Sequence, residues 1–123
     1  MTTENKRPAG LREVDGFLRQ LALDFFLDRN HRRVEPRHTI TVECALTPVD
    51  RSGRPTGAAP VTAITRDISC GGIGLTSRDP LHGLLRVELT SLSGTELCVC
   101  AEVLRCEPSG YYFNVGCRFV DAT

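Results

Sequence analysis

The spacing of apolar residues along this chain changes once, near residue 30. Between Leu11 and about Leu27 they recur every three or four residues, which is the period of an amphipathic helix. Beyond Asn30 they recur at every second residue, which is the period of a half-buried strand. The pattern therefore predicts one N-terminal helix followed by a region made of strands.

Six short strands separated by turns are predicted in the second region. They span Thr39–Thr47, Val61–Ile68, Ile73–Thr76, Leu84–Leu92, Leu97–Cys106 and Tyr111–Phe119, with a turn at Glu107–Gly110 between the last two. Short strands in this arrangement are typical of a small antiparallel barrel. We therefore expect a mainly β protein, a six-stranded antiparallel β-barrel with an N-terminal α-helix. The expected division is 1–28 for the tail and helix and 29–121 for the barrel domain.

The apolar stripe of the predicted helix has two interpretations. Its residues can dock the helix on the rest of the domain, as in most surface helices. Five of them (Leu11, Val14, Leu18, Leu21 and Phe25) also fit a two-heptad seam. The second interpretation predicts a homodimer through the helix, and the first predicts a monomer.

Composition limits the compartment and the chemistry. The 123 residues contain no apolar run long enough to span a membrane and no secretory signal, so we expect a cytoplasmic protein. The six cysteines are then expected to be reduced thiols, with Cys44, Cys70, Cys106 and Cys117 as small buried hydrophobes. No metal-ligand spacing or catalytic motif is present, and the only lysine is Lys6. We expect no metal, no cofactor and no enzymatic activity.

The charge balance points to one local site. Fifteen basic and fifteen acidic residues cancel, which argues against a general polyanion binder. Residues 29–66 nevertheless carry a net charge of +4. Their arginines Arg29, Arg32, Arg33 and Arg37 lie within nine residues, and Pro36 prevents a regular helix there. Guanidinium groups suit phosphate oxygens and guanine edges, although a solvated basic linker would have the same composition.

A second cluster follows the second predicted strand. Asp67 and Ser69 are two residues apart, so they point to the same side of a strand, and Gly71 and Gly72 follow. A carboxylate can accept two hydrogen bonds from the N1–H and N2–H edge of guanine. The alternative is a strand that ends in a turn, with Asp67 and Ser69 capping the local backbone.

Together the two clusters resemble the signature of the PilZ domain family. Arg33-x-x-x-Arg37 followed by Asp67-x-Ser69-x-x-Gly72 is similar to its RxxxR and [DN]xSxxG motifs, and the resemblance extends over residues 29–120. It implies a six-stranded barrel that binds cyclic di-GMP, a bacterial second messenger. By this resemblance Arg33 and Arg37 clamp phosphate and guanine, Asp67 and Ser69 hold a guanine, and Gly72 shapes the turn.

Further residues enter the expected site less directly. In the family, an arginine at the position of Arg32 tends to accompany binding of a stacked pair of cyclic di-GMP molecules. Arg29 supplies another cation near such a pair, and Gly71 adjoins the second motif. The expected ligand-binding residues are therefore Arg32, Arg33, Arg37, Asp67, Ser69 and Gly72, with Arg29 and Gly71 as further candidates.

The expected function is that of a receptor that changes conformation and signals to an unidentified effector protein controlling motility, exopolysaccharide or biofilm. Two alternatives remain open. One is a PilZ-like protein-interaction adaptor that binds no ligand. The other is a small-barrel nucleic-acid binder, which the neutral net charge and the low aromatic content of 6% disfavour, so DNA is not an expected partner.

Overall fold

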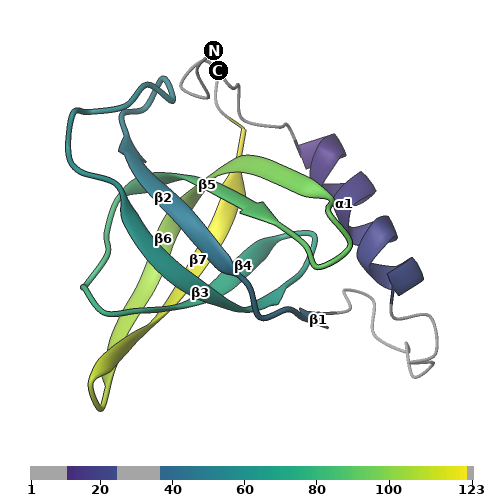
Figure 1. The fold of residues 1–123 in the computed structure, drawn as a ribbon. Helices are drawn as coiled ribbons and strands as arrows, with labels where there is room; N and C mark the ends of the chain where they lie inside the picture. The colour runs from purple at the N-terminus through teal and green to yellow at the C-terminus, as the bar shows by residue number, and fades with distance from the viewer. Residues whose placement is uncertain (1–10, 25–36, 122–123) are drawn as a thin grey trace.

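The computed structural model describes residues 11–24 and 37–121 of the chain (Figure 1). One helix precedes all the strands, as the change in hydrophobic period predicts. The elements are α1 (Leu11–Asp24), β1 (His38–Thr39), β2 (Glu43–Val49), β3 (Val61–Ile68), β4 (Gly72–Ser77), β5 (Leu84–Thr90), β6 (Glu96–Ser109) and β7 (Tyr112–Val120).

Six of the strands form a closed antiparallel barrel, which confirms the predicted fold. Neighbouring strands pair in the order β3-β2-β5-β6-β7-β4, and a further pairing between β3 and β4 closes the ring. The short strand β1 pairs with the end of β3 and lies outside the ring. Inward-facing aliphatic side chains from all six strands fill the interior, as expected for a small barrel.

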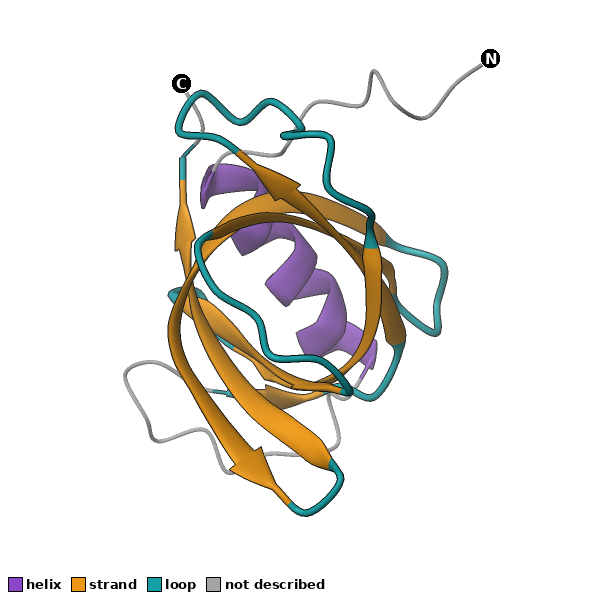
Figure 2. Cartoon of the chain, turned by 90° about the vertical axis from the view of Figure 1, so that its left-hand side faces the viewer, coloured by secondary structure: helices purple, strands orange, loops and turns teal. Residues whose placement is uncertain are grey.

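Helix α1 covers one opening of the barrel. Figure 2 looks through the ring of strands and shows the helix behind the far opening. Val14, Phe17 and Leu18 are buried and belong to the same apolar core as the strands. The helix therefore docks on its own barrel through these three side chains, as one of the two interpretations predicts. Among the described residues, no helix has the length and apolarity needed to cross a membrane.

The first predicted strand, Thr39–Thr47, is wrong as a continuous element. The structure divides it into β1 and β2, and residues 40–42 lie in neither. Here the Thr65 hydroxyl donates to the Ile40 carbonyl (2.6 Å) and accepts from the Val42 amide (2.9 Å). A side chain thus replaces part of the backbone ladder, and Ile40 is buried in the core. Alternation of residue types along the chain does not reveal that a side chain takes the place of these backbone hydrogen bonds.

The turn predicted at Glu107–Gly110 is also misplaced. Strand β6 continues to Ser109, and only Gly110 and Tyr111 separate it from β7, so the two strands form a long hairpin that extends beyond the barrel (Figure 1). Gly110 has a φ of 66°, which favours glycine. Pro108 is tolerated in the strand because the pairing of β5 with β6 ends at Glu102, so beyond that point β6 is a free edge on one side.

The cysteines follow the expectation with one exception. All six are free thiols, and Cys44, Cys98, Cys100 and Cys117 are buried. Cys106 is partly buried and packs against the core. Cys70, however, is exposed, because it lies in the turn between β3 and β4 and not in a strand.

Candidate ligand-binding site

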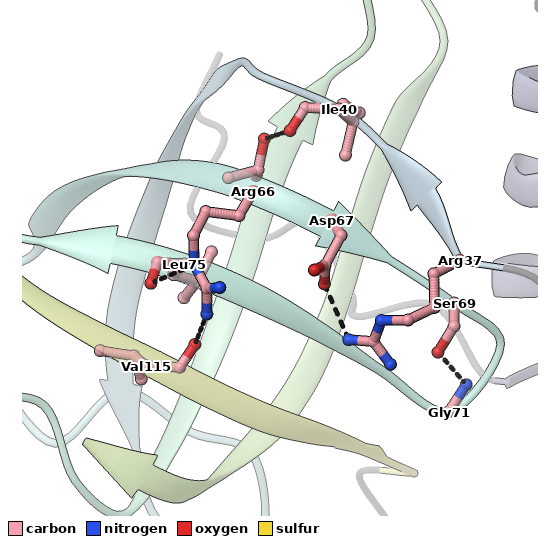
Figure 3. A network of polar contacts seen from close by, with 9 residues as sticks. Arg37, Ile40, Arg66, Asp67, Ser69, Gly71, Leu75 and Val115 are labelled. Carbon is pink, nitrogen blue, oxygen red and sulfur yellow. Dashed lines mark hydrogen bonds and ion pairs between the residues drawn. The ribbon is translucent and has the colours of Figure 1, made fainter. Parts of the chain in front are cut away.

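The two sequence motifs meet at the end of β3. Arg37 immediately precedes β1, and the pairing of β1 with β3 places Thr39 opposite Asp67. The Nη2 atom of Arg37 donates a hydrogen bond to Oδ1 of Asp67 at 2.8 Å (Figure 3). A pairing of only two residues on each strand therefore brings together side chains that are thirty positions apart.

This ion pair is open to solvent. The side chain of Arg37 is 50% exposed and that of Asp67 is 28% exposed. Water competes with both partners at such exposure, so exposed pairs stabilise a fold by only about 0–1 kcal/mol. Because both side chains lie on the surface, either could exchange its partner for another group without disturbing the core.

Ser69 is placed differently from Asp67. It is buried, and its backbone amide donates to the Gly72 carbonyl at 2.9 Å. Its hydroxyl accepts a hydrogen bond from the Gly71 amide at 3.3 Å (Figure 3). A hydrogen bond of this kind is what we expect if Ser69 caps the local backbone, which is the alternative interpretation of the motif. In this structure the hydroxyl shapes the turn from β3 to β4, whereas Asp67 reaches across to Arg37.

The two glycines of the motif have different surroundings. A Cβ atom on Gly72 would lie 2.1 Å from the Cys117 carbonyl oxygen, so a side chain at this position is excluded by the backbone of β7. A Cβ atom on Gly71 would have no neighbour within 4 Å. The Gly71 carbonyl instead accepts a hydrogen bond from the Phe119 amide at 2.9 Å. The absence of a side chain at Gly72 thus permits β4 and β7 to approach each other closely at the end of the motif.

The structure adds residues that the motifs do not reveal. The pairing of β3 with β4 is irregular between Thr65 and Asp67, which leaves Arg66 at the irregularity. Arg66 extends across β4, where its Nε donates to the Leu75 carbonyl (3.3 Å) and its Nη2 to the Val115 carbonyl (3.4 Å), as Figure 3 shows. The sequence shows that a basic residue stands directly before Asp67. The direction of the Arg66 side chain across β4, however, depends on the irregular pairing of β3 with β4.

Gly74 is the second addition. It pairs with Asp67, and a Cβ atom on Gly74 would lie 2.8 Å from Oδ1 of Asp67 and 3.0 Å from Nη2 of Arg66. The missing side chain therefore leaves room for the observed positions of both groups. Gly74 is two residues after Gly72, so both glycines lie on the same side of β4. This spacing is the feature of the sequence that points to Gly74.

The described part of the site contains five of the expected residues. Arg37, Asp67, Ser69, Gly71 and Gly72 lie together around the end of β3 and the start of β4. The other three predicted residues, Arg29, Arg32 and Arg33, fall outside the described residues.

Solved structures with a similar fold are known. YcgR from Escherichia coli, in complex with c-di-GMP, matches with a TM-score of 0.56 and 14% identity over 75% of this chain and 39% of its own. MrkH from K. pneumonia, also in complex with c-di-GMP, matches with a TM-score of 0.55 and 19% identity over 76% of this chain and 45% of its own. The Bacillus subtilis inhibitor of motility MotI/DgrA matches with a TM-score of 0.54 and 18% identity over 76% and 44%.

These likenesses concern the fold, and this chain spans less than half the length of each of the three proteins. No curated protein sequence matches the chain. The model of one family does match it, the PilZ domain, over residues 28–123. That match covers the barrel and both motifs, and the closed six-stranded barrel agrees with it. The chain therefore belongs to the PilZ domain family.

Proposed function

We propose that this chain is a bacterial, cytoplasmic receptor for cyclic di-GMP that acts by binding and conformational change, without catalysing a reaction. One observation carries the proposal. Arg37 and Asp67, one from each motif, lie 2.8 Å apart on the exposed surface of the barrel. A cyclic dinucleotide of guanine needs cations for its phosphates and acceptors for its guanine edges, and the two side chains supply one of each.

The roles follow from this chemistry. Arg37 is proposed to bind phosphate and guanine together with Arg33, and Asp67 is proposed to accept from the N1–H and N2–H of guanine. Ser69 and Gly72 hold the turn that presents Asp67. YcgR and MrkH, whose structures are described as complexes with c-di-GMP, share the barrel and support this choice of ligand.

A stacked pair of ligands is proposed in addition, with Arg32 and Arg29 as the extra cations. Two cyclic dinucleotides bring four phosphates together, which requires more positive charge than one clamp provides. Calorimetry should then give about two ligands per chain for the wild type and about one for Arg32→Leu. A stoichiometry of one for both proteins would remove Arg32 from the site.

Signal output is proposed to pass through α1 to an effector protein that controls motility, exopolysaccharide or biofilm. The helix lies directly before the arginine-rich segment, and it contacts both β1 and β6. Ligand that draws the segment towards Asp67 would change how the helix is held. Hydrogen exchange of residues 11–24 with and without ligand tests this, and unchanged protection would contradict it.

Direct titration tests the proposed ligand. We expect saturable binding of cyclic di-GMP, much weaker binding of GMP, and no binding of single-stranded RNA. Binding of RNA in place of the dinucleotide would favour a nucleic-acid binder. Absence of any binding by a chain that melts cooperatively would favour an adaptor without a ligand.

A further inference from the structure

The outer face of β3, β4, β7 and β6 carries a row of residues that begins at Asp67. Asp67 pairs with Gly74, Gly74 pairs with Gly116, and Gly116 pairs with Arg105. The two middle positions have no side chain. The middle of the row therefore has no side chains of its own, with the Asp67 carboxylate at one end and a cation at the other.

Two guanidinium groups lie against this strip of the sheet, formed by Gly74 and Gly116. Nη2 of Arg66 is 3.0 Å from the position that a Cβ atom on Gly74 would take. Nη2 of Arg105 is 3.5 Å, and its Nε 3.7 Å, from the corresponding position on Gly116. The glycines thus let both groups approach the sheet closely while each arginine stays exposed. Arg66 is also held by two backbone carbonyls, so it loses little freedom when it binds.

The positive charge of these two groups is not neutralised within residues 11–24 and 37–121. Asp67 is paired with Arg37, and no ion pair joins Arg66 or Arg105 to any carboxylate in that part of the chain. Glu107 follows Arg105 by two residues on β6 without pairing with it. Arg66 and Arg105 come from β3 and β6, but their guanidinium groups lie over Gly74 and Gly116, which are paired on the neighbouring strands β4 and β7. Like charges placed in this way repel each other, so an anion between them would relieve the repulsion.

We infer that Arg66 and Arg105 form an anion-binding extension of the site, which takes a phosphate and the attached guanine from beyond the Arg37–Asp67 pair. A guanidinium fork binds phosphodiester oxygens, and its planar face stacks on a purine. Because Gly74 and Gly116 have no side chains, both guanidinium groups lie low against the sheet, and a base would stack on these groups and not on the strip itself. The inference rests on the proposed function and extends it to residues outside the two motifs.

The nucleotide on this extension has two sources with the same chemistry. It is either the far half of the cyclic di-GMP molecule that Asp67 holds or part of a second, stacked molecule. Replacing both arginines distinguishes the two. A weaker affinity at unchanged stoichiometry identifies the far half, whereas a fall from about two ligands to about one identifies the second molecule.

The experiment is calorimetric titration of Arg66→Gln, Arg105→Gln and the double variant with cyclic di-GMP. We expect each single substitution to raise the Kd by roughly tenfold, and the double variant to show a shallower dependence of affinity on salt. Arg51→Gln is the matched control, because Arg51 is an exposed arginine in the loop after β2. This end of β2 pairs with the start of β3, whereas Asp67 lies at the opposite end of β3. We expect it to bind like the wild type.

The outcomes separate this inference from the proposed function. If the double variant binds as tightly as Arg51→Gln while Arg37→Ala loses binding, the extension is wrong and the receptor stands. If the folded wild type fails to bind cyclic di-GMP, both are overturned together. The side chain of Arg105 makes no hydrogen bond within the described part of the chain, so Arg105→Gln should fold normally and keeps the test decisive.

Discussion

Arg37 and Asp67 form an ion pair with each other, although each is also expected to bind the ligand. Their side chains are joined at 2.8 Å, and both remain partly exposed. An exposed pair of this kind adds little to the free energy of unfolding. The pair joins the residue before β1 to the end of β3, so the proposed ligand would meet two groups that are already side by side.

The first prediction separates the effect of this pair on stability from its effect on binding. In a double-mutant cycle of Arg37→Ala and Asp67→Ala, we expect a coupling below about 1 kcal/mol in urea unfolding. Each single variant should lose on the order of 2–5 kcal/mol of cyclic di-GMP binding, because a charged contact with the ligand is lost. Unfolding curves and calorimetry measure the two. Near-wild-type affinity in both single variants would contradict the assignment.

Asp67 is also predicted to select the base. Only guanine offers the N1–H and N2–H donors that a carboxylate accepts together, and adenine has no such pair. Asp67→Ala should therefore bind cyclic di-GMP more weakly and should be competed by cyclic di-AMP more effectively than the wild type is. Asp79→Ala, at an exposed aspartate outside the motifs, is the control. An unchanged preference would assign Asp67 to backbone structure alone.

Three glycines should respond differently to the same substitution. Gly72→Ala places Cβ 2.1 Å from a backbone oxygen that cannot move aside, so we expect a loss of about 3 kcal/mol of stability or failure to fold. Gly71→Ala meets nothing within 4 Å and should change stability by less than about 1 kcal/mol. For Gly74→Ala the atoms nearest to the new Cβ are the movable ends of Asp67 and Arg66, so this variant should fold but bind more weakly. Thermal melts and titration of the three variants test this order, and equal stability of all three would refute it.

The buried thiols predict a loss of stability at high pH. Burial raises the pKa of Cys44 from 9.0 to about 12 and that of Cys117 from 9.0 to about 11. The folded chain therefore keeps these protons at pH values where the unfolded chain releases them. The contribution of these thiols to the free energy of unfolding should be constant below about pH 9. Above that pH it should fall, with each thiol adding a slope of up to about 1.4 kcal/mol per pH unit.

Urea unfolding between pH 8 and pH 11 measures this dependence. Cys44→Ala should be less stable at pH 8, because it leaves a small cavity, but its stability should fall less steeply with rising pH. Cys70→Ala is the control, since Cys70 is exposed, and it should keep the wild-type slope. An unaltered slope in Cys44→Ala would show that other groups cause the alkaline transition.

The periods of the hydrophobic pattern predict the element types well, because they depend on which face of each local segment is buried. Strand β3 spans Val61–Ile68 as predicted, and α1 begins at Leu11 as predicted. Where the prediction failed, the cause was the tertiary surroundings of the segment, which local spacing does not contain. The Thr65 hydroxyl interrupts the first strand at residues 40–42, and the free edge of β6 allows Pro108 inside a strand.

For the site, the residue types and the order of the two motifs are already contained in the sequence. The resemblance to the family signature already assigns Arg37 and Asp67 to one site, because the residue types and spacing of each short motif can be read directly from the sequence. The barrel itself was needed to show that Arg66 and Arg105 face the same strip. Their proximity depends on the register of β3, β4, β7 and β6 and on the irregularity at Arg66. Strand register results from packing across the whole barrel, so local sequence spacing does not contain it.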